Sequence, residues 1–207
     1  MPDDPSAPSA QPPTLPCRIQ ARLSDYYGID DAPDVDDFIE PADGDRETLF
    51  VREEGGDLEV LLRLPRAALD AGKPARFDEL CQVIEGVNHF VYLAERARRE
   101  LPATQLELEL QAEVDKWVVL AASMRETFDE ERSAALRTRL YERVSFDHPA
   151  TTGHGERYRI ANDAAHRFVR RLEREYVGRA RFSDMRGELL RFFHVGQEEK
   201  LRLGRAA

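Results

Sequence analysis

The sequence predicts a mainly α-helical protein of the α+β class: an antiparallel bundle of about five helices with an N-terminal β-hairpin and a short acidic helix. Apolar residues recur at helical spacing through residues 78–203, and Pro149 is the only proline between Ala103 and the C-terminus. An apolar run at 48–64 has a Gly-Gly pair near its centre, which is typical of a hairpin. Hydrophobic residues make up 42% of the 207 residues, enough for one domain with a core.

The first 16 residues differ from the rest in composition. They contain six of the chain's 12 prolines among Ser, Ala, Gln and Asp. Such a segment buries too little apolar surface to offset its ordering entropy, so we predict a disordered tail at 1–16 and a single helical domain at 17–207. No apolar run reaches the roughly 18 residues of a membrane span. The N-terminus also lacks the pattern of a secretion signal, and a cytoplasmic location is expected.

Residues Asp25–Asp45, here called the acidic-aromatic segment, hold nine acids and no Lys or Arg. Within the segment, Val35, Phe38 and Ile39 recur at i, i+3, i+4 between two prolines, which predicts one short amphipathic helix. An element this apolar must pack on another surface. We expect Tyr27, Val35, Phe38 and Ile39 to supply binding contacts, either within the chain, in a homodimer or with another protein.

Two β-strands are predicted at Thr48–Arg52 and Leu58–Leu64, joined by a link that contains two glycines. An isolated hairpin is only marginally stable in water. The alternating Leu and Val side chains of the second strand are therefore expected to face the helices.

Two sequence matches to the capping box mark predicted helix starts. In this motif the side chains of the cap residue and of the residue three positions later satisfy each other's free backbone amides. Thr104 with Glu107 is one match, and Thr127 with Glu130 is the other. Trp117 lies on the apolar stripe of the helix that starts at Thr104 and should be buried. The predicted helices are Asp78–Arg98, one starting at Thr104, Thr127–Val144, Glu156–Tyr176 and Ser183–Leu203.

Charge divides the chain into an acidic and a basic part. Residues 1–130 hold 13 Lys and Arg against 29 Asp and Glu, whereas residues 131–207 hold 17 against 11. The basic part contains an arginine stripe, four residues at i, i+3, i+4, i+7 of one predicted helix: Arg167, Arg170, Arg171 and Arg174. This stripe suits a solvated face, an acidic protein segment such as Asp25–Asp45, or a nucleic-acid backbone. The net charge of −10 disfavours nucleic acid.

Glu85 and His89 stand four residues apart on one predicted helix, and Glu109 and Glu113 lie on the next. Metal sites inside helical bundles use Glu and His three residues apart. At 100° per residue, His89 lies about 160° from the apolar stripe of its helix. We therefore expect His89 to face away from the core and to form a solvated or second-layer pair with Glu85. Glu113 lies closer to its own stripe, and we expect it to pair with a basic residue from another helix.

The most polar interhelical loop contains Asp147, His148 and His154. It offers a metal site or an acid–base pair as one interpretation, but its glycines and threonines favour an exposed connector. The chain has neither a phosphate-binding Gly-rich loop nor a nucleophile elbow. Cys17 and Cys81 match no disulfide or zinc spacing. No metal and no cofactor are expected.

These observations favour a non-enzymatic bacterial interaction protein, an adaptor or regulator. It would engage a protein partner or a second copy of itself through the acidic-aromatic segment or the arginine stripe. The alternative is a helical-bundle metal-binding protein or enzyme that uses its Glu and His side chains; the third hypothesis is nucleic-acid binding through the stripe. A pocket that collects two or more of the named Glu and His side chains is the structural observation that best separates the first two.

Overall fold

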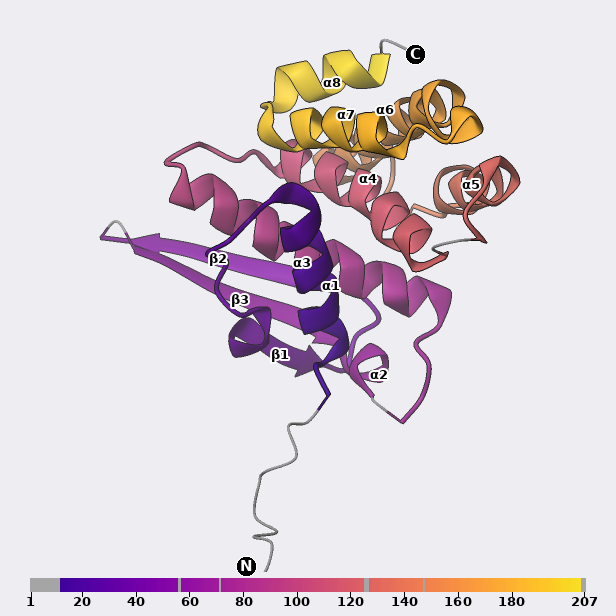
Figure 1. Cartoon of the computed structure of the whole chain (residues 1–207). Helices are drawn as coiled ribbons and strands as arrows, with labels where there is room; N and C mark the ends of the chain where they lie inside the picture. Colours follow the sequence, from indigo (N-terminus) through magenta and orange to yellow (C-terminus); the bar gives the residue numbers. More distant parts are fainter. Residues whose placement is uncertain (1–11, 56, 71, 125–126, 147, 206–207) are drawn as a thin grey trace, which may run out of the picture.

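The computed structural model describes residues 12–55, 57–70, 72–124, 127–146 and 148–205. Within these ranges the chain forms eight α-helices and one three-stranded sheet (Figure 1). The prediction of a mainly helical protein with a small β-structure is confirmed, although the helices number more than the five expected. The α-helices are α1 (Leu15–Tyr27), α2 (Arg66–Leu69), α3 (Phe77–Arg98), α4 (Gln105–Met124), α5 (Glu130–Arg137), α6 (Gly153–Glu175), α7 (Phe182–His194) and α8 (Gln197–Arg205).

Helix α1 begins inside the predicted N-terminal tail. Thr14 caps it by accepting a hydrogen bond from the Cys17 amide at 3.1 Å, and a proline occupies its first turn. Gly28 ends the helix in the left-handed conformation, with a φ of 67°. The predicted tail boundary at residue 16 is therefore wrong, because a capped helix has already begun. Residues 1–11 of the predicted tail lie outside the described residues.

The acidic-aromatic segment forms less helix than predicted. Val35–Phe38 is a single 3-10 turn capped by the Asp34 side chain. The chain then continues directly as strand β1 (Ile39–Ala42), so Ile39 belongs to a strand and not to a helix. Pro41 is tolerated there because β1 lies at an edge of the sheet and needs fewer backbone donors.

The two predicted strands belong to a larger sheet than a hairpin. Strands β2 (Thr48–Glu54) and β3 (Asp57–Pro65) pair antiparallel, and β1 pairs parallel with the other side of β3. Leu62 and Leu64 of β3 are completely buried, and β3 packs against α3. Gly86 of α3 allows this close approach, because a Cβ at this position would lie 2.8 Å from the Leu64 side chain.

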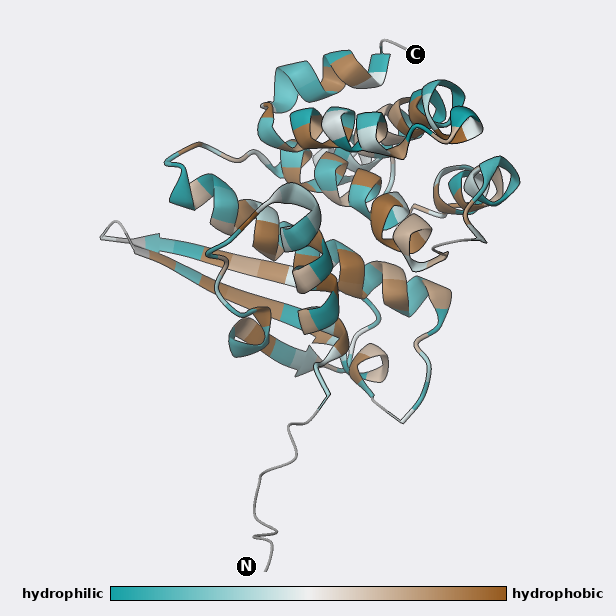
Figure 2. Ribbon diagram, viewed as in Figure 1, coloured by the Kyte–Doolittle hydropathy of each residue, from teal (hydrophilic) through white to brown (hydrophobic). Residues whose placement is uncertain are grey.

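Helices α3 and α4 form the centre of the molecule. Helix α3 packs against α1, the sheet and α4, and α4 packs in turn against α6 and α8 (Figure 1). Hydrophilic residues interrupt the hydrophobic ones along both central helices (Figure 2). Trp117 of α4 is fully buried, as predicted. None of the described helices combines the length and the apolar surface that crossing a lipid bilayer requires.

Of the two predicted capping boxes, one is confirmed and one is wrong. The Glu107 amide donates to the Thr104 hydroxyl at 3.1 Å, and the Thr104 amide donates to the Glu107 carboxylate at 3.0 Å. Helix α5 instead starts at Glu130, after the cap residue Asp129, whose carboxylate accepts from the Arg132 amide at 2.8 Å. Asp129, two residues after Thr127, is the better cap because its carboxylate accepts a hydrogen bond from a free amide of the first turn.

The C-terminal part also departs from the predicted helices. A π-helix, Thr138–Glu142, follows α5 directly. Helix α6 starts three residues earlier than predicted and is capped by Thr152, whose side chain accepts from the Gly155 amide. The predicted helix Ser183–Leu203 is two helices, α7 and α8, which are separated at Val195 and Gly196.

Candidate functional site

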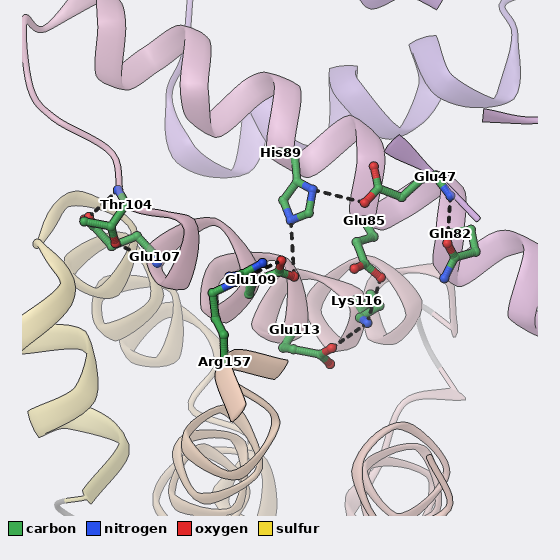
Figure 3. Close-up of polar contacts among 10 residues, drawn as sticks. All are labelled: Glu47, Gln82, Glu85, His89, Thr104, Glu107, Glu109, Glu113, Lys116 and Arg157. Atoms are coloured by element: carbon green, nitrogen blue, oxygen red, sulfur yellow. Dashed lines mark hydrogen bonds and ion pairs between the residues drawn. The ribbon is translucent and has the colours of Figure 1, made fainter. Parts of the chain in front are cut away.

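Glu85 and His89 are buried, which corrects the prediction that His89 faces away from the core. Their exposed fractions are 7% and 6%. The prediction assumed that α3 buries a single face, but α3 is covered by α1, α4 and the sheet, so its polar side also faces protein. His89 lies between Glu47, which precedes β2, and Glu109 of α4 (Figure 3). We call Glu47, Glu85, His89 and Glu109 the carboxylate–histidine cluster.

Both ring nitrogens of His89 face carboxylates. Its Nδ1 lies 3.4 Å from Glu47 Oε1, and its Nε2 lies 3.9 Å from Glu109 Oε2. Glu47, Glu85 and His89 each offer one ligand atom, and these three atoms lie within 4.8 Å of one another. Ligand atoms that share one ion at bond lengths of about 2.0–2.2 Å lie at most about 4.4 Å apart, so a small movement of these side chains brings them to bonding distance of one ion.

Glu47 reaches the cluster because α3 holds it there. Its backbone N–H donates to Gln82 Oε1 at 2.9 Å. A Cβ on Gly86 would lie 3.3 Å from Glu47 Cβ, so the absence of a side chain at Gly86 lets the start of β2 approach the helix. Sequence reasoning missed Glu47 because its contacts lie far along the chain, with Gln82 35 positions away.

Lys116 of α4 neutralises two acids at one end of the cluster. Its Nζ lies 3.2 Å from Glu85 Oε2 and 2.8 Å from Glu113 Oε1 (Figure 3). Glu113 thus pairs with a basic residue of its own helix and not, as predicted, of another helix. At the other end, Arg157 of α6 places its Nε 3.6 Å from Glu109 Oε1.

These charges shift the pKa values of the cluster. Burial alone would lower the pKa of His89, but Glu47, Glu109 and Glu85 raise it to about 9. Burial raises the pKa of Glu109 to about 7. Burial also opposes ionisation of Glu85, but the charges of Lys116 and His89 outweigh it and lower the pKa of Glu85. At neutral pH, a protonated His89 therefore supplies positive charge among the carboxylates.

Three buried atoms of this site have no hydrogen-bond partner in the described part of the chain: Glu47 Oε2, His89 Nε2 and Arg157 Nε. The side chains of His89 and Glu47 are only 7% and 9% exposed, so solvent does not satisfy them. Buried polar atoms in folded proteins are nearly always paired. Buried carboxylate and imidazole atoms that lack a protein partner are typical of a ligand site.

A cavity of about 500 Å³ adjoins the cluster at Glu85. Glu85, Glu113 and Lys116 line it with side chains only 10–13% exposed, so they form its inner end. Cys81 also lines the cavity, and burial raises the pKa of its thiol to about 12. A thiol with this pKa is a poor nucleophile at neutral pH, which leaves the carboxylates, Lys116 and His89 as the reactive groups nearby.

The arginine stripe does not receive the acidic-aromatic segment, and it is not a uniformly exposed face. Arg171 is only 9% exposed, because α7 covers it. Arg170 is exposed. Three members pair with acids of α6 and α7: Arg167 with Asp163 at 2.9 Å, Arg171 with Glu188 at 3.2 Å, and Arg174 with Glu175 at 3.1 Å.

The acidic-aromatic segment packs instead against α1 and α3. The centroid of the Phe38 ring lies 4.9 Å from the centroid of the Phe90 ring in α3. Val35 is fully buried, and its amide donates to Gln20 of α1 at 2.8 Å. Ile39 is half-buried in β1. These contacts explain the apolar content of the segment without an external partner.

The two loop histidines lie on the surface, and one of them borders the cavity beside the cluster. His148 and His154 are exposed, with ring centroids 5.5 Å apart, and His154 belongs to the first turn of α6. Asp147, the third candidate ligand of this loop, lies outside the described residues. His148 lines the same cavity as Glu85 and Glu113, so the structure brings one of these two histidines to the candidate site.

A second buried polar cluster was not predicted at all. The Asp115 carboxylate accepts hydrogen bonds from Tyr27, from Asn88 at 2.5 Å and from Gln111 at 2.8 Å. Lys200 of α8 donates to Gln111 and to the backbone oxygen of residue 192. Burial lowers the pKa of Lys200 to about 7 and raises that of Asp115 to about 6. We call Tyr27, Asn88, Gln111, Asp115 and Lys200 the Lys200 cluster.

Comparison of the chain with protein-family models, with curated proteins and with solved structures finds no significant match. The functional argument therefore depends on the geometry of the site.

Proposed function

We propose that this protein binds one divalent metal ion through Glu47, Glu85 and His89. The observation that carries the proposal is the convergence of three ligand atoms within 4.8 Å in a buried site where Glu47 Oε2 has no partner among the described residues. Two carboxylates and one imidazole suit first-row divalent ions such as Mn²⁺, Fe²⁺ or Zn²⁺.

The surroundings of His89 support this role. A metal-binding histidine usually donates its second ring N–H to a carboxylate, which fixes the tautomer and orients the ring. Glu109 lies on the Nε2 side of His89, and Arg157 stands behind Glu109. With the ion on the Nδ1 side, next to Glu47, the N–H at Nε2 would face Glu109.

Metal binding must displace the proton of His89, because an imidazolium has no lone pair to donate. The pKa of His89 is about 9, so the apparent metal affinity should rise about tenfold per pH unit up to that pH. Glu109→Gln removes the supporting carboxylate and should weaken binding about 10- to 100-fold.

The test is metal uptake by the full chain after treatment with a chelator and dialysis. Calorimetry with Mn²⁺ and Zn²⁺, and elemental analysis after a second dialysis, should give one ion per chain. His89→Gln should lose this ion, and the matched control His154→Gln, at an exposed histidine, should retain it. Absence of uptake by the wild type, or equal uptake by folded His89→Gln, would overturn the proposal.

We keep protein interaction as a second proposal, supported by an apolar hollow of about 250 Å³ whose lining includes Trp117, Phe128 and Phe182. Phe182 is 42% exposed beside it, and exposed apolar surface of this kind favours association with a second copy. Sedimentation of the wild type and of Phe182→Ser tests this: a dimer that the variant loses supports it, and a monomeric wild type contradicts it.

A further inference from the structure

We propose that the cavity beside the metal site binds a phosphorylated small molecule, with Arg139 and Arg143 holding the phosphate group. This inference rests on the proposed function, since the ion held by Glu85 would lie at the inner end of the same cavity. The volume of about 500 Å³ falls within the range of small-molecule sites, roughly 300–1,000 Å³.

The two arginines occupy the outer part of the cavity. Both line it and both side chains are exposed, whereas the inner Glu85, Glu113 and Lys116 are buried. In the described part of the chain, neither arginine has a carboxylate within ion-pair distance, unlike Arg76 at the same cavity, which pairs with Glu79 at 2.6 Å. Two guanidinium groups are therefore available to an anionic ligand.

Local structure orients the first of these arginines. The guanidinium of Arg139 lies over the ring of Phe77, 3.6 Å from its centroid. A guanidinium stacked on an aromatic face keeps its N–H groups directed outward in its own plane, where they form paired hydrogen bonds with oxyanions. The Phe77 ring thus acts as a support that presents Arg139 to the cavity.

The backbone that carries Arg139 is a π-helix, Thr138–Glu142. This conformation is rare and occurs frequently at functional sites. Here it is held against both walls of the cavity, because the Tyr141 hydroxyl donates to the Glu113 backbone oxygen at 2.8 Å and Asn162 donates to the Tyr141 backbone oxygen at 3.2 Å. Arg143 follows immediately as the C-cap of this element.

Phosphate fits this arrangement better than a carboxylate. A phosphate monoester offers three oxygens, so it can bond two guanidiniums at the rim while another oxygen points to a metal ion at Glu85. Divalent ions held by few carboxylates commonly complete their coordination with substrate phosphates, and arginine forks match phosphate geometry. Lys116 adds a cation at the inner end, although Glu85 and Glu113 already share it.

The test compares phenyl phosphate with benzoate, which carries the same ring on a carboxylate, by calorimetry on metal-loaded and metal-free full-length protein. Phenyl phosphate should bind the loaded protein more tightly than benzoate. Arg139→Gln with Arg143→Gln should weaken it at least tenfold and leave metal uptake intact. The matched control Arg167→Gln with Arg174→Gln, at two exposed arginines of α6, should change nothing.

Failure of this inference is distinguishable from failure of the proposed function. If metal is taken up but phenyl phosphate does not bind, binds no better than benzoate, or binds the cavity variant equally, the phosphate site is overturned and the metal site stands. If the wild type takes up no metal yet binds phenyl phosphate through Arg139 and Arg143, the phosphate site stands and the metal function is overturned.

Discussion

The two polar clusters that flank α4 differ in how completely their atoms are paired. In the Lys200 cluster, Asp115 accepts three hydrogen bonds, and Lys200 donates to Gln111 and to a backbone oxygen at 2.6 Å. Among the described atoms of this cluster, only the side-chain oxygen of Asn88 lacks a partner. A buried network satisfied to this degree stabilises one arrangement of α1, α3, α4 and α8.

The carboxylate–histidine cluster is paired much more loosely. Its contacts to His89 are 3.4 and 3.9 Å long, and Glu47 and His89 each leave one buried atom unpaired in the described structure. Both clusters are largely buried and share the same two central helices, so burial alone does not explain the difference. The difference indicates that one cluster holds the fold together and the other is completed by a ligand.

The largest expected effect is on the Lys200 cluster. Asp115→Ala would leave three buried donors without their acceptor and remove the negative charge that acts on the buried Lys200, and it should lower the free energy of unfolding by about 3–5 kcal/mol. Glu109→Gln in the metal-free protein should change it by less than about 1 kcal/mol, because burial already raises the pKa of Glu109 to about 7. Urea unfolding of both variants measures this contrast. Equal losses would show that the two clusters play the same structural role.

The clusters should respond to pH in opposite directions in the metal-free protein. The pKa of His89 is raised from 6.5 to about 9, so its stabilisation is complete below pH 6.5 and is lost as the pH rises through 9. The pKa of Lys200 is lowered from 10.5 to about 7, so its destabilisation is complete below pH 7 and is relieved as the pH rises toward 10.5. Between pH 7 and 9 the two groups therefore change the free energy of unfolding in opposite directions, each by up to about 1.4 kcal/mol per pH unit.

Single variants should separate the pH dependence that His89 contributes from the one that Lys200 contributes. With His89→Gln, the free energy of unfolding should rise from pH 7 to pH 9, because the contribution of Lys200 then dominates this interval. With Lys200→Met, it should fall over the same interval, with a total change on the order of 2 kcal/mol. Urea titrations at pH 7, 8 and 9 in the presence of a chelator measure both. Parallel pH profiles of the two variants would contradict the assigned ionisations.

The close approach of the sheet to α3 should matter for the metal site and only moderately for stability. A Cβ on Gly86 would lie 2.8 and 2.9 Å from two fully buried leucines and 3.3 Å from Glu47 Cβ. Gly86→Ala should therefore lower the free energy of unfolding by about 1–3 kcal/mol and weaken metal binding by displacing Glu47. Gly187→Ala is the control, since no atom lies within 4 Å of that position; it should stabilise α7 by up to about 1 kcal/mol. Metal binding unaffected by Gly86→Ala would remove Glu47 from the site.

The local elements could be predicted from the sequence, but the surroundings of the central helices could not. Apolar periodicity and the Thr104 box located α3 and α4, and they correctly buried Trp117. The same periodicity misplaced His89, because a helical projection assumes one buried side, and α3 has several. Helix α1 had a readable signal that was overlooked, a Thr cap followed by Pro in the first turn.

Long-range partners left no local signal. Lys200 is preceded by Glu198 and Glu199, as expected on a surface, yet it is fully buried because α8 folds back over α4. Glu47 belongs to an acidic stretch that resembles a solvated loop. Sequence patterns alone identified four candidate residues of the site: Glu85, His89, Glu109 and Glu113. That Glu47 lies beside them depends on tertiary packing and could not be predicted from local patterns.

The smallest expected effect concerns the start of α4, the helix shared by both clusters. The Thr104 hydroxyl accepts from the Glu107 amide at 3.1 Å and donates to Gln197 of α8 at 2.7 Å. Thr104→Ala should therefore lower the free energy of unfolding by about 0.5–2 kcal/mol. Thr127 is the matched control, because its hydroxyl donates to the Met124 backbone oxygen and caps no described helix. Thr127→Ala should lower the free energy of unfolding by only about a few tenths of a kcal/mol. Asp129→Ala, at the cap of α5, should have an effect similar to that of Thr104→Ala. Equal denaturation midpoints for Thr104→Ala and Thr127→Ala would mean that the start of α4 adds nothing to the stability of the frame that holds the two clusters.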